Sequence, residues 1–284
     1  MEEMKIEVVP NAEVLATLVG TEIDKQISTA KAFPRDIEKA LANAERIALM
    51  SQGIAESCNY ALARKQLNEK TGQYENKIIQ GPSVRLAEIV TSQWGNMRSG
   101  ARVISNDGRF ITAQGFCHDL ESNNFIAIEV KRKITNKHGK TFTEDMQVVT
   151  GNAACKIAFR NAVFTVIPAA LVSDIYEKVL IKSKGTEKTL EERRNAAMKW
   201  FSEKDVTPEQ IFETLGVTTL EEIDLEKLQI LVGMASSIKN GEFSKEDLFP
   251  DPDEKKNSTG KEKADQSLKN TMDELTKKDK NKQQ

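Results

Sequence analysis

The sequence predicts an α+β fold in which an antiparallel β-meander packs on a long, basic-striped helix. Three observations lead to this prediction. Apolar residues recur at helical steps in the first third of the chain, alternate with polar residues over 101–134, and dominate a helical stretch over 146–167. N-terminal helices precede this core. We expect a core domain at 1–182, a small helical domain at 190–250 and a disordered tail at 251–284.

Helical periodicity dominates the chain before residue 95. One apolar face between residues 11 and 33 carries Val14, Leu15, Leu18, Val19, Ile23 and Ile27. Pro34 interrupts this helix, a second helix follows from Ile37, and Ala55–Arg64 is a third helix candidate. The polar residues 65–80 predict a loop or a hairpin. Ser83 is placed to cap a helix over Val84 to Trp94, which Gly95-Asn96 would end.

The period then changes to two, which predicts strands. The candidates are Ala101–Ser105, Arg109–His118 and Phe125–Ile134, separated by turn-forming Asn, Asp and Gly residues. The third strand is the clearest because its two faces differ. Its apolar face holds Ile126, Ile128, Val130 and Ile134, and its polar face holds Glu129, Lys131 and Lys133. We therefore expect a meander with one buried face.

Residues 146–167 predict a long helix that Pro168 ends. It is apolar almost all round, except for Asn152, Lys156 and Arg160, which lie four residues apart on one stripe. Two interpretations stay open: the stripe faces an anionic ligand, or it forms an internal salt bridge with Glu129 or Asp145.

The remainder of the chain divides into helices and a polar tail. Lys182–Thr189 reads as a linker, and helices are expected over Leu190–Ser202, Thr207–Leu215 and Asp224–Asn240, with a further helix start at Thr219–Glu222. Residues 251–284 carry nine Lys against eight Asp and Glu and no aromatic residue. Such a segment cannot bury enough apolar surface to offset its ordering entropy.

Charge is unevenly distributed along the chain. The whole chain has 41 Lys and Arg against 43 Asp and Glu, a net charge of −2. Residues 81–160 hold eleven basic and seven acidic residues, so this part carries +4 and the rest carries −6. Local positive potential sets phosphate affinity. Trp94 and Phe110 lie in the same part, where each is either a core residue or a platform for a stacked base.

Several chemistries lack their motifs. The three cysteines form no CxxC pair, two histidines exclude a HExxH site, and no phosphate-binding GxxxxGK[ST] loop is present. We expect no cofactor and no enzymatic activity. The charged MEEMKIEVVPN start and the lack of a run of ~20 apolar residues lead us to expect a cytoplasmic protein without a membrane segment.

Four segments carry a resemblance to a family of phage-encoded proteins: IDKQISTAKAFPR (23–35), AESCNYAL (55–62), GPSVRLAEIVTSQWGN (81–96) and TGNAACKIAFRNAVFTVIP (150–168). The order of helix, three strands and long basic helix further resembles single-strand annealing proteins such as RecT, Red beta and Erf.

That resemblance implies a phage or prophage recombinase in the host cytoplasm. It would bind single-stranded DNA and anneal complementary strands without ATP, as a homo-oligomeric ring or filament that also holds the annealed duplex. Residues 190–250 would bind a single-strand-binding protein or a companion exonuclease. The DNA groove would lie between sheet and long helix. The candidate DNA-binding residues are Arg85, Arg98, Arg102, Lys131, Lys133, Lys137, Asn152, Lys156 and Arg160.

Two alternatives remain. One is a single-strand DNA-binding or replication accessory protein that does not anneal. The other is a nuclease in which Asp119 and Glu129 hold Mg²⁺ and Lys131 assists the attacking water, because these residues form a D-x9-ExK pattern.

Overall fold

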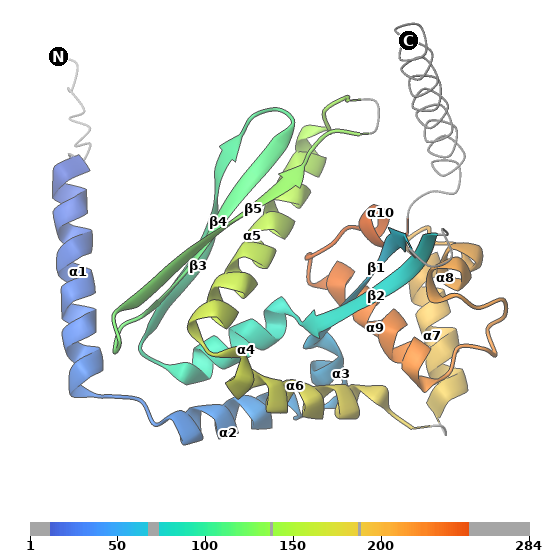
Figure 1. Ribbon diagram of the computed structural model, residues 1–284, viewed down its shortest axis with the longest axis horizontal. Coiled ribbons are helices and arrows are strands. Elements are labelled where there is room, and N and C mark those ends of the chain that lie inside the picture. The colour runs from blue at the N-terminus through green and yellow to red at the C-terminus, as the bar shows by residue number, and fades with distance from the viewer. Residues whose placement is uncertain (1–11, 68–73, 137–138, 187–188, 250–284) are drawn as a thin grey trace, which may run out of the picture.

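The computed structural model describes residues 12–67, 74–136, 139–186 and 189–249, and it confirms a mixed α+β fold with two antiparallel sheets (Figure 1). The first half of the chain contains α1 (Ala12–Ala32), α2 (Ile37–Ala48), α3 (Gln52–Ser57), β1 (Asn59–Leu67), β2 (Tyr74–Pro82), α4 (Val84–Trp94), β3 (Met97–Asn106), β4 (Phe110–Asp119) and β5 (Asn124–Lys133). The second half contains α5 (Glu144–Val166), α6 (Ala169–Lys184), α7 (Leu190–Ser202), α8 (Pro208–Leu215), α9 (Leu225–Lys239) and α10 (Lys245–Leu248).

The predicted meander is present as the sheet β3-β4-β5, and α5 packs on one of its faces (Figure 1). Small residues allow this packing: Ala113 of β4 meets Ala154 and Ala158 of α5 in one buried cluster. Gly115 marks the closest approach, because a Cβ atom built on it would lie 2.2 Å from the carbonyl carbon of Ala158. The long helix therefore lies directly on the middle strand.

The other face of this sheet points away from α5. Gly115 faces α5, so alternation places the even-numbered residues of β4 on the opposite side, together with their cross-strand partners. This surface, the open face, carries Arg98, Arg102, Phe110, Phe125, Glu129, Lys131 and Lys133. Helix α1 approaches one end of it, where Glu22 lies 3.8 Å from Arg98.

The helix expected over Ala55–Arg64 is wrong. Ser51 caps α3, which ends at Ser57, and the chain then forms the hairpin β1–β2. The reason is tertiary packing, which overrides a local preference for helix. Ala61 is fully buried under α9, where a Cβ atom built on Gly233 would lie 3.0 Å from the Ala61 Cβ, and Leu62 fills the same core.

Helix α6 was not expected. Pro168 ends α5 and also stands at the N-cap of α6, so one residue closes a helix and opens the next. Val172, Ile175 and Val179 of α6 are buried in one core with Leu86 and Val163. The linker expected over 182–189 is wrong in its first three residues, because α6 continues to Lys184.

The C-terminal helices form a small core around Leu190, Val217, Ile223 and Leu228, and they share a second core with the β1–β2 hairpin. Phe201, Ile211 and Leu231 share a hydrophobic cluster with Ala61 and Leu62 of β1. The predicted start of α8 is confirmed, with a capping box between Thr207 and Gln210. The start expected at 219–222 is wrong, because Asp224 caps α9 and the Glu222 carboxylate accepts hydrogen bonds from Thr218 instead.

The expected tail, 251–284, lies outside the described residues. Within the described part of the chain, no single helix is long and apolar enough to cross a membrane; α5 and α6 pass that test only together, with a bend of 118° between them.

Candidate nucleic-acid interface

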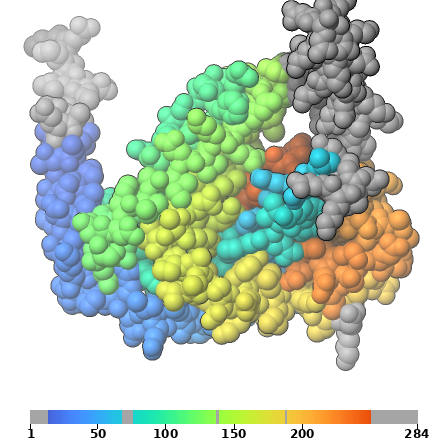
Figure 2. Space-filling model, viewed as in Figure 1, coloured from blue at the N-terminus to red at the C-terminus, as the bar shows by residue number. Residues whose placement is uncertain are grey.

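A groove of about 950 Å³ lies between the meander with its long helix and the C-terminal helices. We call it the α5–α9 groove. Figure 2 shows the red α9–α10 segment recessed between the green meander and the blue-green β1–β2 hairpin. Its polar lining includes Arg132, Lys133, Asn152, Lys156, Lys239, Glu246 and Asp247, and its apolar lining includes Phe142, Met146, Val149, Ile238 and Phe243.

Three elements supply the cations of the groove. Arg132 and Lys133 end β5, Lys156 comes from the middle of α5, and Lys239 is the last residue of α9. Glu246 and Asp247 of α10 are the acidic lining residues, so the groove carries four positive charges against two negative ones. The apolar side chains lie among these charges. Such a lining offers contacts to phosphates and to the faces of bases in one channel.

Internal contacts hold some of these cations in place. Arg132 donates to Asp247 at 2.5 Å and lies 5.7 Å from the centre of the Phe243 ring. Lys239 lies 4.9 Å from the Trp200 ring. The side chains of Lys133 and Asn152 are exposed to solvent, so both are accessible to a ligand.

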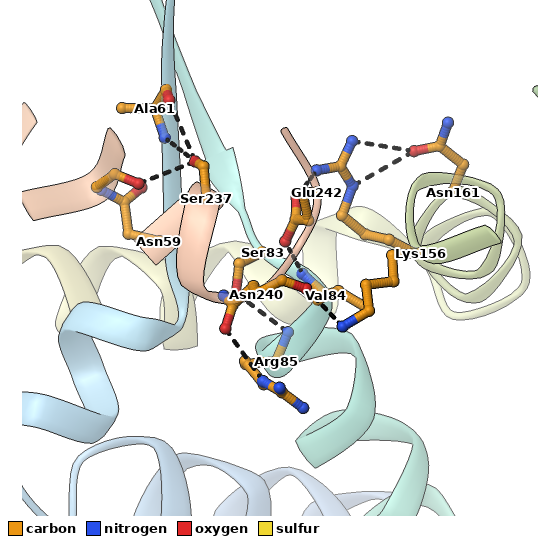
Figure 3. Close-up of polar contacts among 12 residues, drawn as sticks. Asn59, Ala61, Ser83, Val84, Arg85, Lys156, Asn161, Ser237, Asn240 and Glu242 are labelled. Atoms are coloured by element: carbon orange, nitrogen blue, oxygen red, sulfur yellow. Dashed lines mark hydrogen bonds and ion pairs between the residues drawn. The ribbon is translucent and has the colours of Figure 1, made fainter. Parts of the chain in front are cut away.

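Arg160 does not line this groove. The expectation that it contacts DNA is corrected, because its side chain is buried. Its guanidinium is buried and donates to Glu242 at 2.5 Å (Figure 3). The centre of the Tyr60 ring lies 4.3 Å from it. The internal salt-bridge interpretation is therefore confirmed, but the partner is Glu242 and neither Glu129 nor Asp145. Each residue of a helix is rotated by about 100° from the one before it, so positions four apart differ by about 40° around the helix axis. Over two such steps the stripe moves from Asn152, which faces the groove, to Arg160, which faces the interior.

Glu242 anchors the far wall of the groove. It is fully buried and also accepts the backbone N–H of Val84 at 2.6 Å (Figure 3). Burial raises the pKa of this carboxyl above its usual 4.5, whereas Arg160 and the Val84 amide act in the opposite direction. The carboxylate thus joins the start of α4, the C-terminal third of α5 and the segment after α9.

Lys156 and Arg85 hold the same wall from two sides. The Lys156 ammonium donates to the Asn240 carbonyl at 2.5 Å, and Arg85 Nε donates to the Asn240 side chain at 3.1 Å (Figure 3). Arg85 also pairs with Glu88 at 2.7 Å. Lys156 reaches the groove, whereas Arg85 lies behind it and supports the wall.

The remaining predicted residues lie elsewhere. Arg98, Arg102 and Lys131 are on the open face, and Lys133 stands at the end of β5 where that face meets the groove. Lys137 lies outside the described residues. The structure therefore brings Lys133, Asn152 and Lys156 together and separates them from Arg85, Arg98, Arg102, Lys131 and Arg160.

Sequence reasoning missed Arg132 and Lys239. Strand alternation places Arg132 on the inner face of β5, where an ordinary core residue is expected. Lys239 lies in the region that was expected to be a separate domain. The contact of α9 with β1 places it at the groove, and a local pattern does not report such a contact.

The nuclease pattern does not converge on one site. Glu129 pairs with Gln114, which precedes Asp119 by five residues, so Asp119 and Glu129 are about 17 Å apart on opposite faces. Asp119 is ion-paired with Arg35. Burial acts to raise the pKa of Asp119, but the hydrogen bonds from Arg35 and from backbone amides outweigh it and leave this pKa below 3.8.

Trp94 is buried with its ring 5.1 Å from the Arg35 guanidinium, which confirms its interpretation as a core residue. Among the described residues, no group of three or more His, Cys, Asp or Glu side chains is placed to hold a metal ion. Comparison with protein-family models, with curated proteins and with solved structures gives no match.

Proposed function

We propose that this protein binds single-stranded DNA in the α5–α9 groove and anneals complementary strands without ATP. The observation that carries the proposal is the groove itself, in which Lys133, Lys156 and Lys239 from three elements surround apolar side chains. Basic side chains neutralise phosphates, and apolar and aromatic side chains contact bases that are not paired.

The lining favours a single strand over a duplex. A duplex presents its phosphates outward and keeps its bases stacked, so apolar groove residues such as Met146, Val149 and Phe243 would gain little from it. An unpaired strand exposes base faces to these side chains while its phosphates lie near the lysines. Annealing then draws its free energy from base pairing, which requires no nucleotide hydrolysis.

The resemblance to phage annealing proteins supports the biological part of the proposal. On this basis we propose that the protein acts in the host cytoplasm as a phage or prophage recombinase and works as a homo-oligomer. We propose that its partner is a single-strand-binding protein or a companion exonuclease. The meander packed on a long helix agrees with the element order on which that resemblance rests.

A double substitution in the groove tests the binding step. Lys133→Ala with Lys239→Ala removes two phosphate contacts. We expect binding to weaken by about tenfold, and the slope of log affinity against log salt to become shallower by about 1.4, because each single-strand phosphate contact contributes ~0.7. Fluorescence anisotropy of a labelled oligonucleotide between about 50 and 200 mM salt measures both quantities.

The matched control removes two lysines at a distance from the groove. Lys184 and Lys227 form ion pairs with Glu226 and Asp224, so Lys184→Ala with Lys227→Ala makes the same change in net charge. We expect an unchanged salt slope for the control. A groove variant that is folded by circular dichroism and keeps the wild-type slope contradicts the proposed site.

Annealing is tested separately with two complementary oligonucleotides that carry a fluorophore and a quencher. We expect the protein to accelerate quenching in the absence of ATP, and the groove variant to lose that acceleration. Binding without any acceleration would instead favour the alternative of a non-annealing single-strand-binding accessory protein.

A further inference from the structure

The open face of the sheet β3-β4-β5 carries unpaired positive charge. Arg102, Lys131 and Lys133 are exposed there, and none of the three forms an ion pair within the part of the chain that the structure describes. Glu129 lies among them, and Asp107 in the turn after β3 is close enough to Lys131 to feel its charge. The face keeps an excess of positive charge, which attracts an anionic partner.

Aromatic rings lie on the same face, where an antiparallel sheet commonly carries polar side chains. Phe125 is 56% exposed, and its ring centre lies 6.3 Å from that of Phe116 with 23° between the two planes. Gly100 leaves room for Phe116 to lie across β3, because a Cβ atom built on it would be 3.0 Å from the Phe116 ring. At the opposite end of the face, Phe110 is 38% exposed and pairs with Lys133 across the sheet. The open face therefore offers flat aromatic surface and positive charge together.

The described chain covers only one end of this face. Helix α1 approaches it where Glu22 lies 3.8 Å from Arg98, and α5 lies on the opposite side of the sheet (Figure 1). Charge alone would suit any anionic partner, but the exposed rings favour one that also presents flat groups. A single nucleic-acid strand has both features, since its phosphates pair with cations and its unpaired bases stack on aromatic side chains. Antiparallel sheets with exposed aromatic residues bind single strands in this way.

We propose that the open face binds a second nucleic-acid strand. The proposal rests on the proposed function, in which the α5–α9 groove holds the first strand. Lys133 lines that groove and also stands on the open face, so the two surfaces meet at the end of β5. A chain that holds two strands raises the effective concentration of each strand for the other, which is what annealing requires.

The number of strands bound by each chain tests the proposal. The probe is an oligothymidylate of about ten nucleotides, which cannot pair with itself and is about as long as a single-strand site. We expect isothermal titration calorimetry to give two oligonucleotides per wild-type chain and one per chain for Arg102→Ala with Lys131→Ala. Both side chains are exposed, so the fold should persist. The charge-conserving variant Arg102→Lys with Lys131→Arg should bind two. A folded alanine variant that binds as many oligonucleotides as the wild-type chain overturns the proposal.

A fluorescent side chain on the open face tests the stacking contact directly. We expect the oligonucleotide to quench the added tryptophan of Phe125→Trp, and to leave that of the control Ile181→Trp unchanged, because Ile181 is 75% exposed on α6. Phe125→Ala should weaken binding of the second oligonucleotide by about tenfold through the loss of one stacked base. Equal quenching in both tryptophan variants overturns the proposal. An equal affinity of the open face for polyglutamate of the same charge assigns it to an acidic protein and also overturns it.

A groove variant separates this proposal from the proposed function. Asn152→Ala with Lys239→Ala changes two exposed residues of the α5–α9 groove and none of the open face. One oligonucleotide per wild-type chain that only the groove variant loses contradicts the second strand alone. One that only the open-face variant loses contradicts the groove and supports the open face. A chain that binds no oligonucleotide contradicts both.

Discussion

At the scale of single residues, the Arg160–Glu242 ion pair is buried, so the loss of either partner would leave a desolvated charge. Glu242 is fully buried and Arg160 is 8% exposed. Breaking such a pair costs more than the pair contributes, because the remaining charge stays desolvated. The Val84 amide gives Glu242 a second partner, so the carboxylate depends on two neighbours and not on one.

Arg160→Ala should therefore lower the free energy of unfolding by about 3–5 kcal/mol. Removing the cation raises the pKa of Glu242 further above 4.5, so the folded variant binds a proton that the unfolded chain has released. Stability then falls as pH rises above 4.5 through the folded-state pKa, and the destabilisation should be smaller at pH 5 than at pH 8. Urea unfolding at both pH values measures it, and an equal loss at both would contradict the charge argument.

At the scale of elements, the contact between β4 and α5 depends on one residue without a side chain. A Cβ atom on Gly115 would lie 2.2 Å from backbone atoms of α5, which cannot move aside as a flexible side chain would. The separation of sheet and helix is therefore fixed by Gly115 together with Ala113, Ala154 and Ala158.

Gly115→Ala should lower the free energy of unfolding by about 2–3 kcal/mol, because α5 must shift away from the sheet. The control is Gly53→Ala in α3, where a Cβ atom meets nothing within 4 Å. Alanine is a better helix former than glycine, so the control should gain about 0.5–1 kcal/mol. Chemical denaturation compares the two; a neutral Gly115→Ala would mean that helix and sheet are less tightly packed than described.

The elements also show what a sequence can predict. The meander strands and α5 follow from period-two alternation and a long apolar run, which are local signals. Strand β1 does not follow from local signals. The backbone N–H of Ala61 donates to the hydroxyl of Ser237, which lies 176 residues further along the chain. Within the site, Lys156 and Arg160 are both basic residues on one stripe of α5, so the sequence does not distinguish them. Their different angular positions around the helix axis place Lys156 in the groove and Arg160 in the interior.

At the scale of the whole molecule, the C-terminal helices have a small core of their own and also complete the core around β1. Phe201, Ile211 and Leu231 cover Ala61 and Leu62, and Glu242 closes on Arg160. The groove wall formed by Lys239 and Asp247 belongs to the same region. The fold and the proposed binding surface thus both depend on the region after residue 190.

A chain that ends at residue 189 should consequently fail to fold as the full chain does, because β1 loses its cover and Arg160 loses its partner. We expect a broad or absent thermal transition and aggregation in size-exclusion chromatography. A chain that ends at residue 249 keeps every one of these contacts and should match the full chain in stability and in oligonucleotide binding. A sharp, unshifted transition in the shorter chain would contradict the shared core.

The pairing of β1 with α9 also sets an order of events during synthesis. Ala61 leaves the ribosome 176 residues before Ser237, the residue that bonds it. At ~5–20 residues per second, that interval lasts about 10–35 seconds. For that time the β1–β2 hairpin lacks α9, the helix that covers its apolar side, so a nascent-chain chaperone that shields this hairpin would be useful until α9 is made.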